Sequence, residues 1–159
     1  MDLIVRAATT ADGNGLLELL PRLAEFDLPA SRNPRHLWEG DAELVRQWID
    51  GNAPDCRVHV AVDGDTVVGL AVVTLRPELL SKAPSAHLEA LAVAAGYEGR
   101  GLGYGLLAAA EKDALAGGAE SMTLHVFAVN ERARGLYEKA GYTGELMRYI
   151  KPLQESSDR

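Results

Sequence analysis

The sequence predicts an α/β fold in one domain, with a central mixed β-sheet covered by helices on both faces. Two observations lead to this fold class. Strand-like and helix-like segments follow one another along the chain, and no internal repeat, low-complexity block or linker divides it. The 159 residues, 47% of them hydrophobic, suffice for one well-buried core and are too few for two ordinary domains. We therefore expect one domain over residues 1–153 and a frayed polar tail over residues 154–159.

The first two elements are a strand and an imperfect helix. Residues 3–7 are predicted to form the strand, and Thr9 followed three residues later by Asp12 resembles a capping box at a helix start. Pro21 interrupts this helix, which should therefore be kinked or short. Its apolar positions recur at helical spacing at Leu16, Leu20 and Leu23.

A loop, a second helix and a hairpin come next. Residues 26–40 contain prolines and are expected to form the loop, and residues 41–50 are expected to form the helix. The apolar, β-branched segments 57–62 and 66–76 flank Asp63-Gly64-Asp65, which is a strong signal for a β-hairpin. The apolar face of the second helix carries Leu44, Val45, Trp48 and Ile49.

The second half of the chain continues the alternation of strands and helices. The expected elements are a fourth strand at residues 85–94, a third helix ending at Gly117-Gly118, a fifth strand at residues 121–129, a fourth helix at residues 131–140 and a last strand region at residues 142–153. By strand alternation, one face of the fourth strand should carry His87, Glu89, Leu91 and Val93.

Residues 97–110 join the fourth strand to the third helix. Four glycines alternate there with larger residues and lead into an alanine-rich helix. The free backbone N–H groups and the positive dipole end of such a helix bind phosphate without lysines. We therefore favour an anion-binding loop over a flexible turn. The glycines are Gly99, Gly101, Gly103 and Gly105.

Other nucleotide-binding folds fit this loop less well. A Walker-type phosphate loop requires Gly-Lys-Ser/Thr, which is absent. Gly103, Gly105 and Ala108 fit the spacing of a dinucleotide fingerprint, but that fold normally places it at the start of a domain. Only about fifty residues follow Ala108 here, so a nucleotide-dependent oxidoreductase is a distant alternative.

The segment after the fifth strand carries a family resemblance. It contains Asn130, Ala133, Tyr137, Glu138, Lys139, Gly141 and Tyr142, in the pattern N-x-x-A-x-x-x-Y-E-K-x-G-Y. Together with the apolar fourth strand and the glycine loop, this pattern resembles the GNAT superfamily of N-acetyltransferases. The resemblance is close over residues 88–142 and implies a three-layer fold with a mixed sheet of six to seven strands. It also implies that the two helices before the hairpin, and the loop between them, line the binding site of the acceptor.

The resemblance implies acetyl-CoA as cosubstrate, held where the fourth and fifth strands splay apart. Aligned on Gly101 and Gly103, the Gln or Arg of the family's loop falls on Glu98; the shifted register Arg100, Gly103, Gly105 is the alternative. A backbone N–H near Leu91 or Ala92 would stabilise the oxyanion. The residues that the resemblance assigns to the cofactor are Leu91, Ala92, Val93, Gly99, Arg100, Gly101, Leu102, Gly103, Tyr104, Asn130, Ala133 and Tyr137.

Acetyl transfer by direct attack of an amine, through a tetrahedral intermediate, needs a base and an acid. The motif implies that Tyr137 is the acid for the leaving thiolate; a ring packed in the core is the structural alternative. Glu89 and His87 are the candidate bases, with Glu89 slightly ahead and His125 a weaker choice. Asn130 is assigned to cofactor binding, to helix capping, or to both.

The amino-acid composition excludes several classes of binding partner. The net charge of −7 argues against sequence-independent binding to nucleic acid or to an anionic membrane. The single cysteine, Cys56, excludes an intrachain disulfide, and metal-ligand spacings are absent, so neither a disulfide nor a metal is expected. Without a signal peptide or an apolar span, the protein is expected to be cytoplasmic.

These features predict an acetyl-CoA-dependent N-acetyltransferase that acts on a primary amine of a small molecule or peptide. A catalytically silent domain of the same fold, binding acyl-CoA as a sensor or partner module, is the alternative. The sequence does not identify the acceptor and leaves a homodimer open.

Overall fold

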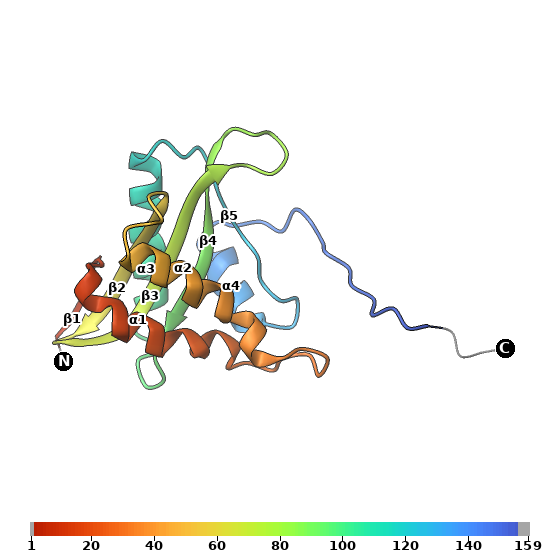
Figure 1. Cartoon of the computed structure of the whole chain (residues 1–159), viewed down its shortest axis with the longest axis horizontal. Helices are drawn as coiled ribbons and strands as arrows, with labels where there is room; N and C mark the ends of the chain where they lie inside the picture. Colours follow the sequence, from red (N-terminus) through yellow and green to blue (C-terminus); the bar gives the residue numbers. More distant parts are fainter. Residues whose placement is uncertain (1, 156–159) are drawn as a thin grey trace.

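The computed structural model describes residues 2–155, and its centre is one five-stranded mixed sheet (Figure 1). The strands lie side by side in the order of the chain, the first four antiparallel to their neighbours and the last parallel to β4. This confirms the predicted α/β class, but the described residues form five strands and not six to seven. The strands are β1 Leu3–Ala7, β2 Cys56–Asp63, β3 Thr66–Pro77, β4 Pro84–Val93 and β5 Met122–Leu124.

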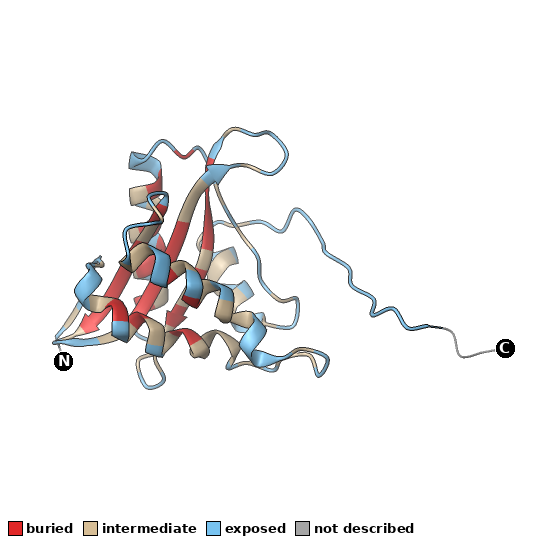
Figure 2. Cartoon of the chain, in the orientation of Figure 1, coloured by how far each residue is buried: buried red, intermediate tan, exposed pale blue. Residues whose placement is uncertain are grey.

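Helices cover both faces of the sheet, as predicted. On one face α1 and α2 pack on a core cluster that includes Leu16, Val45 and Val60, while α3 packs on the other face around Leu106 and Val73 (Figure 2). Residues of α4 pack on the α3 side. The helices are α1 Gly13–Leu19, α2 Glu39–Ile49, α3 Leu102–Ala116 and α4 Glu131–Lys139, with 3₁₀ helices η1 Thr10–Asp12, η2 Leu20–Ala24 and η3 Pro34–Leu37. No helix in residues 2–155 combines the length and apolar character needed to cross a membrane.

The first helix is short, as its proline predicts. The Thr9 N–H donates to Asp12 Oδ2 at 2.8 Å, which confirms the Asp12 half of the capping box. The α-helical hydrogen bonding ends at Leu19, and η2, with Pro21 in its first turn, takes over. Proline offers no N–H for the α-helical ladder, so the tighter 3₁₀ turn follows there.

The hairpin and the end of the third helix also follow the prediction. Asp63 pairs with Thr66 across the hairpin turn, where Gly64 has a φ of +59°. Helix α3 stops at Gly117, whose N–H bonds to the Asp113 carbonyl oxygen at 2.9 Å, and Gly118 follows with a φ of +95°. Glycine adopts this left-handed conformation at little cost, which explains both stops.

Strand β4 contains a β-bulge that the alternation pattern did not predict. Val72 of β3 pairs with Ala90 and Val73 pairs with Leu88, so Glu89 between them has no partner on β3. The extra residue reverses the alternation beyond it. Leu91 and Val93 therefore pack on the α3 side of the sheet, whereas Ala90 and Ala92 belong to the α1–α2 core. The prediction that Leu91 and Val93 share the face of His87 and Glu89 is wrong.

The last two predicted strands are shorter or missing. The predicted fifth strand at residues 121–129 is reduced to Met122–Leu124, which pairs only with residues 86–88 of β4. Beyond Leu88 and Leu124 the two strands part, as the resemblance implies. The predicted strand at residues 142–153 does not form: residues 143–155 are exposed, lie in no strand and extend away from the domain (Figure 1). The expected frayed tail is exposed at residues 154–155, and residues 156–159 lie outside the described residues.

Candidate functional site

The glycine loop ends in an uncapped helix N-terminus. Gly99 and Gly101 have φ values of +74° and +77°, and Gly101 is the N-cap residue of α3. No side chain caps this end, so the N–H groups of the first turn are left for a ligand. The side chain of Leu102 is buried in the α3 core, so of the predicted cofactor residues it has only its backbone to offer. Gly103 lies near Leu136 of α4, and Tyr104 is half exposed.

The second part of the site is the free edge of β4 beyond the bulge. The Ala94 N–H donates to the Val68 carbonyl oxygen at 2.8 Å, which fixes the alternation of the β3–β4 ladder. By that alternation, Ala92 bonds to β3, while the backbone groups of Leu91 and Val93 point toward the gap left by β5. Of the two N–H groups proposed for the oxyanion, that of Leu91 is therefore the one directed into the gap.

An ion network that the sequence did not predict lies between the loop and β4. Arg22 of η2 donates from Nε to the Val93 carbonyl oxygen at 2.9 Å and pairs with Glu98. Arg132 of α4 donates to the same carboxylate at 2.8 Å. The acid at the family's Gln or Arg position is thus neutralised by two arginines. Arg22 is 71 positions from Val93, so no local pattern reveals the contact.

Arg100, a predicted cofactor residue, lies against its own loop. Its guanidinium is 5.2 Å from the centre of the Tyr97 ring and donates to the Gly96 carbonyl oxygen at 3.1 Å. The Tyr97 hydroxyl in turn donates to Asp63 Oδ2 at 2.6 Å, which ties the loop to the β2–β3 hairpin. These contacts hold the loop in place on the sheet and give Arg100 a structural role.

Helix α4 contributes residues on the α3 side of the sheet, where Leu136 lies near Gly103. Asn130 caps the helix, because its Oδ1 accepts from the Ala133 N–H at 3.3 Å. Tyr137 is half-buried and packs edge-on against Tyr142 with 6.0 Å between ring centres. Burial raises the pKa of Tyr137 to about 12, so its hydroxyl keeps its proton at neutral pH. Among residues 2–155 that hydroxyl has no hydrogen-bond partner, which leaves it available to a ligand.

The bulge presents the two candidate bases on the α1–α2 side of the sheet. The Glu89 side chain is 20% exposed, accepts a hydrogen bond from the Thr74 hydroxyl and lies 3.8 Å from the Arg76 guanidinium. His87 is buried, with its Nδ1 2.7 Å from the Thr123 hydroxyl and its ring centre 4.8 Å from that of His125. Burial, and to a lesser extent Arg76, lower the pKa of His87 to about 4. His87 is therefore neutral, and Glu89 is the more accessible base.

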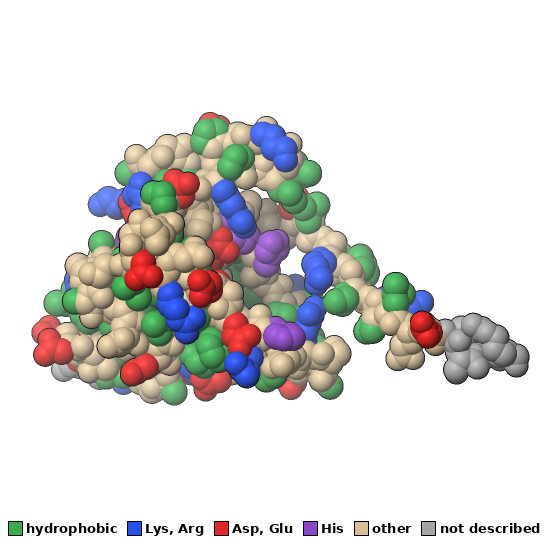
Figure 3. Space-filling view, viewed as in Figure 1, with side chains coloured by type: hydrophobic (Ala, Val, Ile, Leu, Met, Phe, Trp, Pro, Cys, Tyr) green, Lys and Arg blue, Asp and Glu red, His purple; other side chains and the backbone are tan. Residues whose placement is uncertain are grey.

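A second carboxyl group faces this cluster from α2. Burial and the Glu89 carboxylate raise the pKa of Asp41 to about 7. Sequence analysis missed Asp41 because it occupies an ordinary acidic position in the first turn of a helix. The site thus combines two carboxyl groups and two histidines, and Figure 3 shows histidine, acidic and basic side chains around a recess on this face.

Asp41 should make the stability of the protein depend on pH. Its raised pKa means that the folded state holds a proton that the unfolded state releases, so this carboxyl destabilises the fold as pH rises from about 4 to about 7. Asp41→Asn removes the effect. Allowing for partial solvent access, we expect a gain of about 2 kcal/mol at pH 8, or roughly 4–8 °C in Tm, and little gain at pH 4.5. An equal gain at both pH values would contradict this reading.

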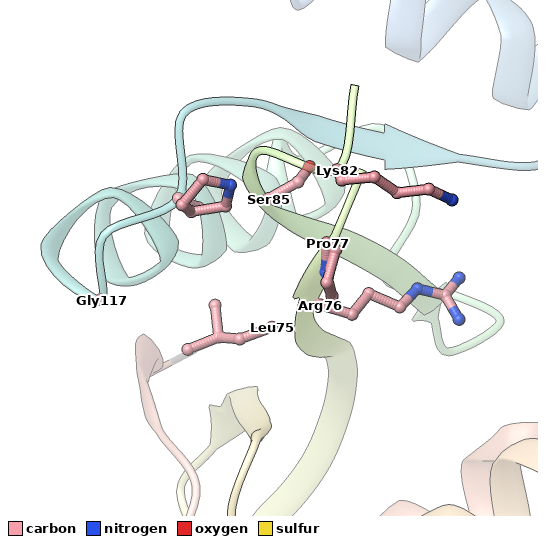
Figure 4. Close-up of a pocket in the computed structure, with 8 residues that line it drawn as sticks. Leu75, Arg76, Pro77, Lys82, Ser85 and Gly117 are labelled. Atoms are coloured by element: carbon pink, nitrogen blue, oxygen red, sulfur yellow. The ribbon is translucent and has the colours of Figure 1, made fainter. Parts of the chain in front are cut away.

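A separate open pocket lies at the opposite end of β4 (Figure 4). It has a volume of about 300 Å³ and is lined by residues that include Leu75, Pro84, Ser85 and Gly117. None of the predicted catalytic or cofactor residues lines it. Arg76, which also lines this pocket, connects it to the candidate functional site, because the Arg76 guanidinium lies 3.8 Å from the Glu89 carboxylate.

Comparisons with known proteins agree with this architecture. The family model described as Acetyltransferase (GNAT) family matches residues 18–142. A search of curated protein sequences finds no match. Among solved structures, a transcriptional regulator from Bacillus halodurans C-125 is 22% identical with a TM-score of 0.72, over 95% of this chain and 99% of that one.

Two further structures carry acetyltransferase names. AAC(6')-Iy, solved with the bisubstrate analogue CoA-S-monomethyl-acetylneamine, is 18% identical with a TM-score of 0.70, over 96% of this chain and 100% of that one. Ribosomal-protein-alanine N-acetyltransferase from Brucella melitensis biovar Abortus 2308 is 15% identical with a TM-score of 0.70, over 96% and 100%. At these identities the structures show a shared fold, and the family model extends over most of the chain. The chain therefore belongs to the GNAT acetyltransferase family.

Proposed function

We propose that the protein transfers an acetyl group from acetyl-CoA to a primary amine of a small molecule or peptide. The observation that carries this proposal is the meeting of two features at one end of the sheet. The free edge of β4 beyond the bulge leads directly into the glycine loop and the uncapped N-terminus of α3. The free edge of β4 offers backbone groups to the amide-containing arm of acetyl-CoA, and the N-terminus of α3 offers N–H groups to its diphosphate.

The residues present fit coenzyme A. Gly101 has no side chain to cap the first turn of α3, and a Cβ there would have no atom within 4 Å, so the loop is open. Leu91 and Val93 offer backbone groups along the gap, although Arg22 already shares the Val93 carbonyl oxygen. Bound acetyl-CoA would supply an activated acetyl thioester beside these strands.

The chemistry at the thioester needs two proton transfers. The amine nitrogen bonds to the acetyl carbon, the carbon–sulfur bond breaks, and the sulfur leaves as thiolate. In our proposal Glu89 takes the proton that the amine loses, because its carboxylate is the more accessible base at the bulge. Tyr137 gives its proton to the thiolate, because its hydroxyl is protonated and unpartnered among the described residues. His87 stays neutral and orients the cluster through Thr123.

Calorimetry tests the cofactor assignment first. Acetyl-CoA and CoA should bind, while NAD and ATP should neither bind tightly nor compete, because the loop joins a splayed strand and not a dinucleotide unit. Tight NAD binding would refute the assignment. Thiol release with a panel of amines then tests turnover. Acetyl-CoA binding without thiol release for any amine would favour the silent acyl-CoA-binding module.

A further inference from the structure

Two side chains of β3 face the proposed base, Glu89. Strand alternation places Thr74 and Arg76 on the same face of the sheet as Val72, which belongs to the α1–α2 core. Figure 4 shows the side chains of Leu75 and Arg76 leaving β3 on opposite sides, as this alternation requires. Because Glu89 is the extra residue of the β4 bulge, no β3 residue pairs with it. Its carboxylate contacts the side chains of Thr74 and Arg76 instead.

The contacts of Glu89 distinguish its two carboxylate oxygens. Oε2 accepts a hydrogen bond from the Thr74 hydroxyl, and the same oxygen lies 3.8 Å from Nη2 of Arg76. Among residues 2–155, Oε1 has neither a hydrogen bond nor an ion pair. The Glu89 side chain is 20% exposed, so the carboxylate is not closed off from an acceptor. One oxygen is therefore fixed, and the other is left for a ligand.

The Thr74 hydroxyl holds the carboxylate more firmly than the Arg76 guanidinium does. A hydroxyl that donates to a carboxylate makes a charge-assisted hydrogen bond, which is stronger than one between neutral groups. The separation of 3.8 Å between Arg76 and Glu89 is too long for a hydrogen bond, and the Arg76 side chain is half exposed, so this ion pair is weak. Threonine is also stiff at χ1, and Thr74 lies on a strand that is paired on both sides. The Thr74 hydroxyl is thus a fixed donor.

We propose that Thr74 is the positioning residue for Glu89, and that Oε1 is the oxygen that takes the proton from the acceptor amine. This inference rests on the proposed function, in which Glu89 is the base. As the amine nitrogen bonds to the acetyl carbon, its N–H bond breaks, the electron pair of that bond stays on nitrogen and Oε1 gains the proton. A free glutamate side chain rotates about several bonds, and a base acts only within hydrogen-bond reach of the proton it takes. The hydrogen bond to Oε2 keeps Oε1 in place without occupying it.

Thr74→Val tests the proposal in the full chain, because valine keeps the branched shape of threonine and removes the donor. The assay is thiol release with the fastest acceptor in a panel of alkylamines and short peptides. We expect kcat to fall about tenfold, with the KM for acetyl-CoA unchanged. Thr74→Ser restores the hydroxyl and should recover most of the rate. An unchanged kcat in Thr74→Val, or no recovery in Thr74→Ser, would overturn the proposal.

Thr66→Val is the matched control for this substitution. Thr66 lies on the same strand, is exposed and has no side-chain hydrogen bond among the described residues. Its valine variant should therefore have the kcat of the wild type. Arg76→Gln should reduce kcat less than Thr74→Val does, because the ion pair is the weaker contact. A larger loss in Arg76→Gln would mean that the ion pair positions the base, which would also overturn the proposal.

A double-mutant cycle separates positioning of the base from a general structural effect. Glu89→Gln keeps an acceptor for the Thr74 hydroxyl but lacks the base. Adding Thr74→Val to Glu89→Gln should therefore change the residual rate by roughly twofold at most. A further loss of about tenfold in that background would show that Thr74 acts on something other than Glu89, and would refute its role.

The wild type tests the proposed function separately. If the wild type releases no thiol with any amine, the proposed function fails, and the role of Thr74 fails with it. If the wild type turns over and Thr74→Val turns over equally well, only the role of Thr74 fails.

Discussion

Replacing Gly101 with valine is expected to weaken acetyl-CoA binding about a hundredfold or more. Gly101 occupies the N-cap position of α3 with a φ of +77°, a conformation that is strongly unfavourable for a β-branched residue. Since a Cβ would meet no atom within 4 Å, the cost is backbone strain and not a clash within the protein. The loop must relax, which moves the N–H groups of the first helical turn away from the diphosphate. Titration calorimetry measures the loss, about 2.7 kcal/mol for a hundredfold change.

Gly118→Val is the matched control for this substitution. Gly118 lies just beyond the other end of α3, with a φ of +95° and no atom within 4 Å of an added Cβ. It should lose stability as Gly101→Val does, by roughly 1–3 kcal/mol, and keep its affinity. Glu98→Gln should change affinity only slightly, because it releases Arg22 and Arg132 without altering the backbone. An equal loss of affinity for Gly101→Val and Glu98→Gln would contradict the prediction, because the Glu98 side chain would then matter as much as the backbone of the loop.

Tyr137→Phe is expected to reduce turnover about a hundredfold while the protein stays folded. The hydroxyl has no partner among residues 2–155, so its removal leaves no buried group unsatisfied and keeps the ring against Tyr142. A general acid typically contributes a hundredfold or more, about 2.7 kcal/mol of barrier. CoA is a fair leaving group unaided, so a tenfold loss would still be consistent with a modest acid role. Steady-state thiol release and calorimetry would show kcat falling while acetyl-CoA affinity is unchanged.

Tyr142→Phe provides the contrasting variant. It removes the hydroxyl bonded to Glu111 at 2.6 Å, so it should lower the free energy of unfolding by about 1–2 kcal/mol and leave turnover nearly intact. A Tyr137→Phe enzyme that turns over at the wild-type rate, under conditions where chemistry limits, would mean that Tyr137 is structural. If Tyr137→Phe turned over at the wild-type rate, water would be the next candidate for the proton donor.

Local patterns predicted most of the fold. The hairpin around Gly64, the break at Pro21 and the stop at Gly117 depend on backbone preferences of single residues, and the structure confirms them. The helix that begins after Gly101 was predicted for the same reason. Strand alternation was reliable only up to Glu89, because a bulge is determined by pairing with a neighbouring strand.

The parts that sequence reasoning missed depend on contacts between distant segments. Arg22 reaches Val93 across 71 positions, and Asp41 meets Glu89 only after α2 packs on the sheet. The strand predicted at residues 142–153 has the apolar content of a strand but no partner within its own described chain. β-propensity reports the fit to a neighbouring strand, so it cannot by itself place a strand.

The bulge in β4 has a consequence for how this fold can lose its chemistry. Leu88 pairs with Val73 and Ala90 pairs with Val72, and they pack on opposite sides of the sheet. Deletion of residue 89 alone would therefore join two segments that are already in register and already alternate correctly. The resulting strand would be more regular than the original and would lack the carboxylate. In evolutionary terms, a one-codon deletion separates the scaffold from the site, so a descendant could keep the whole domain and discard its proposed base in a single step.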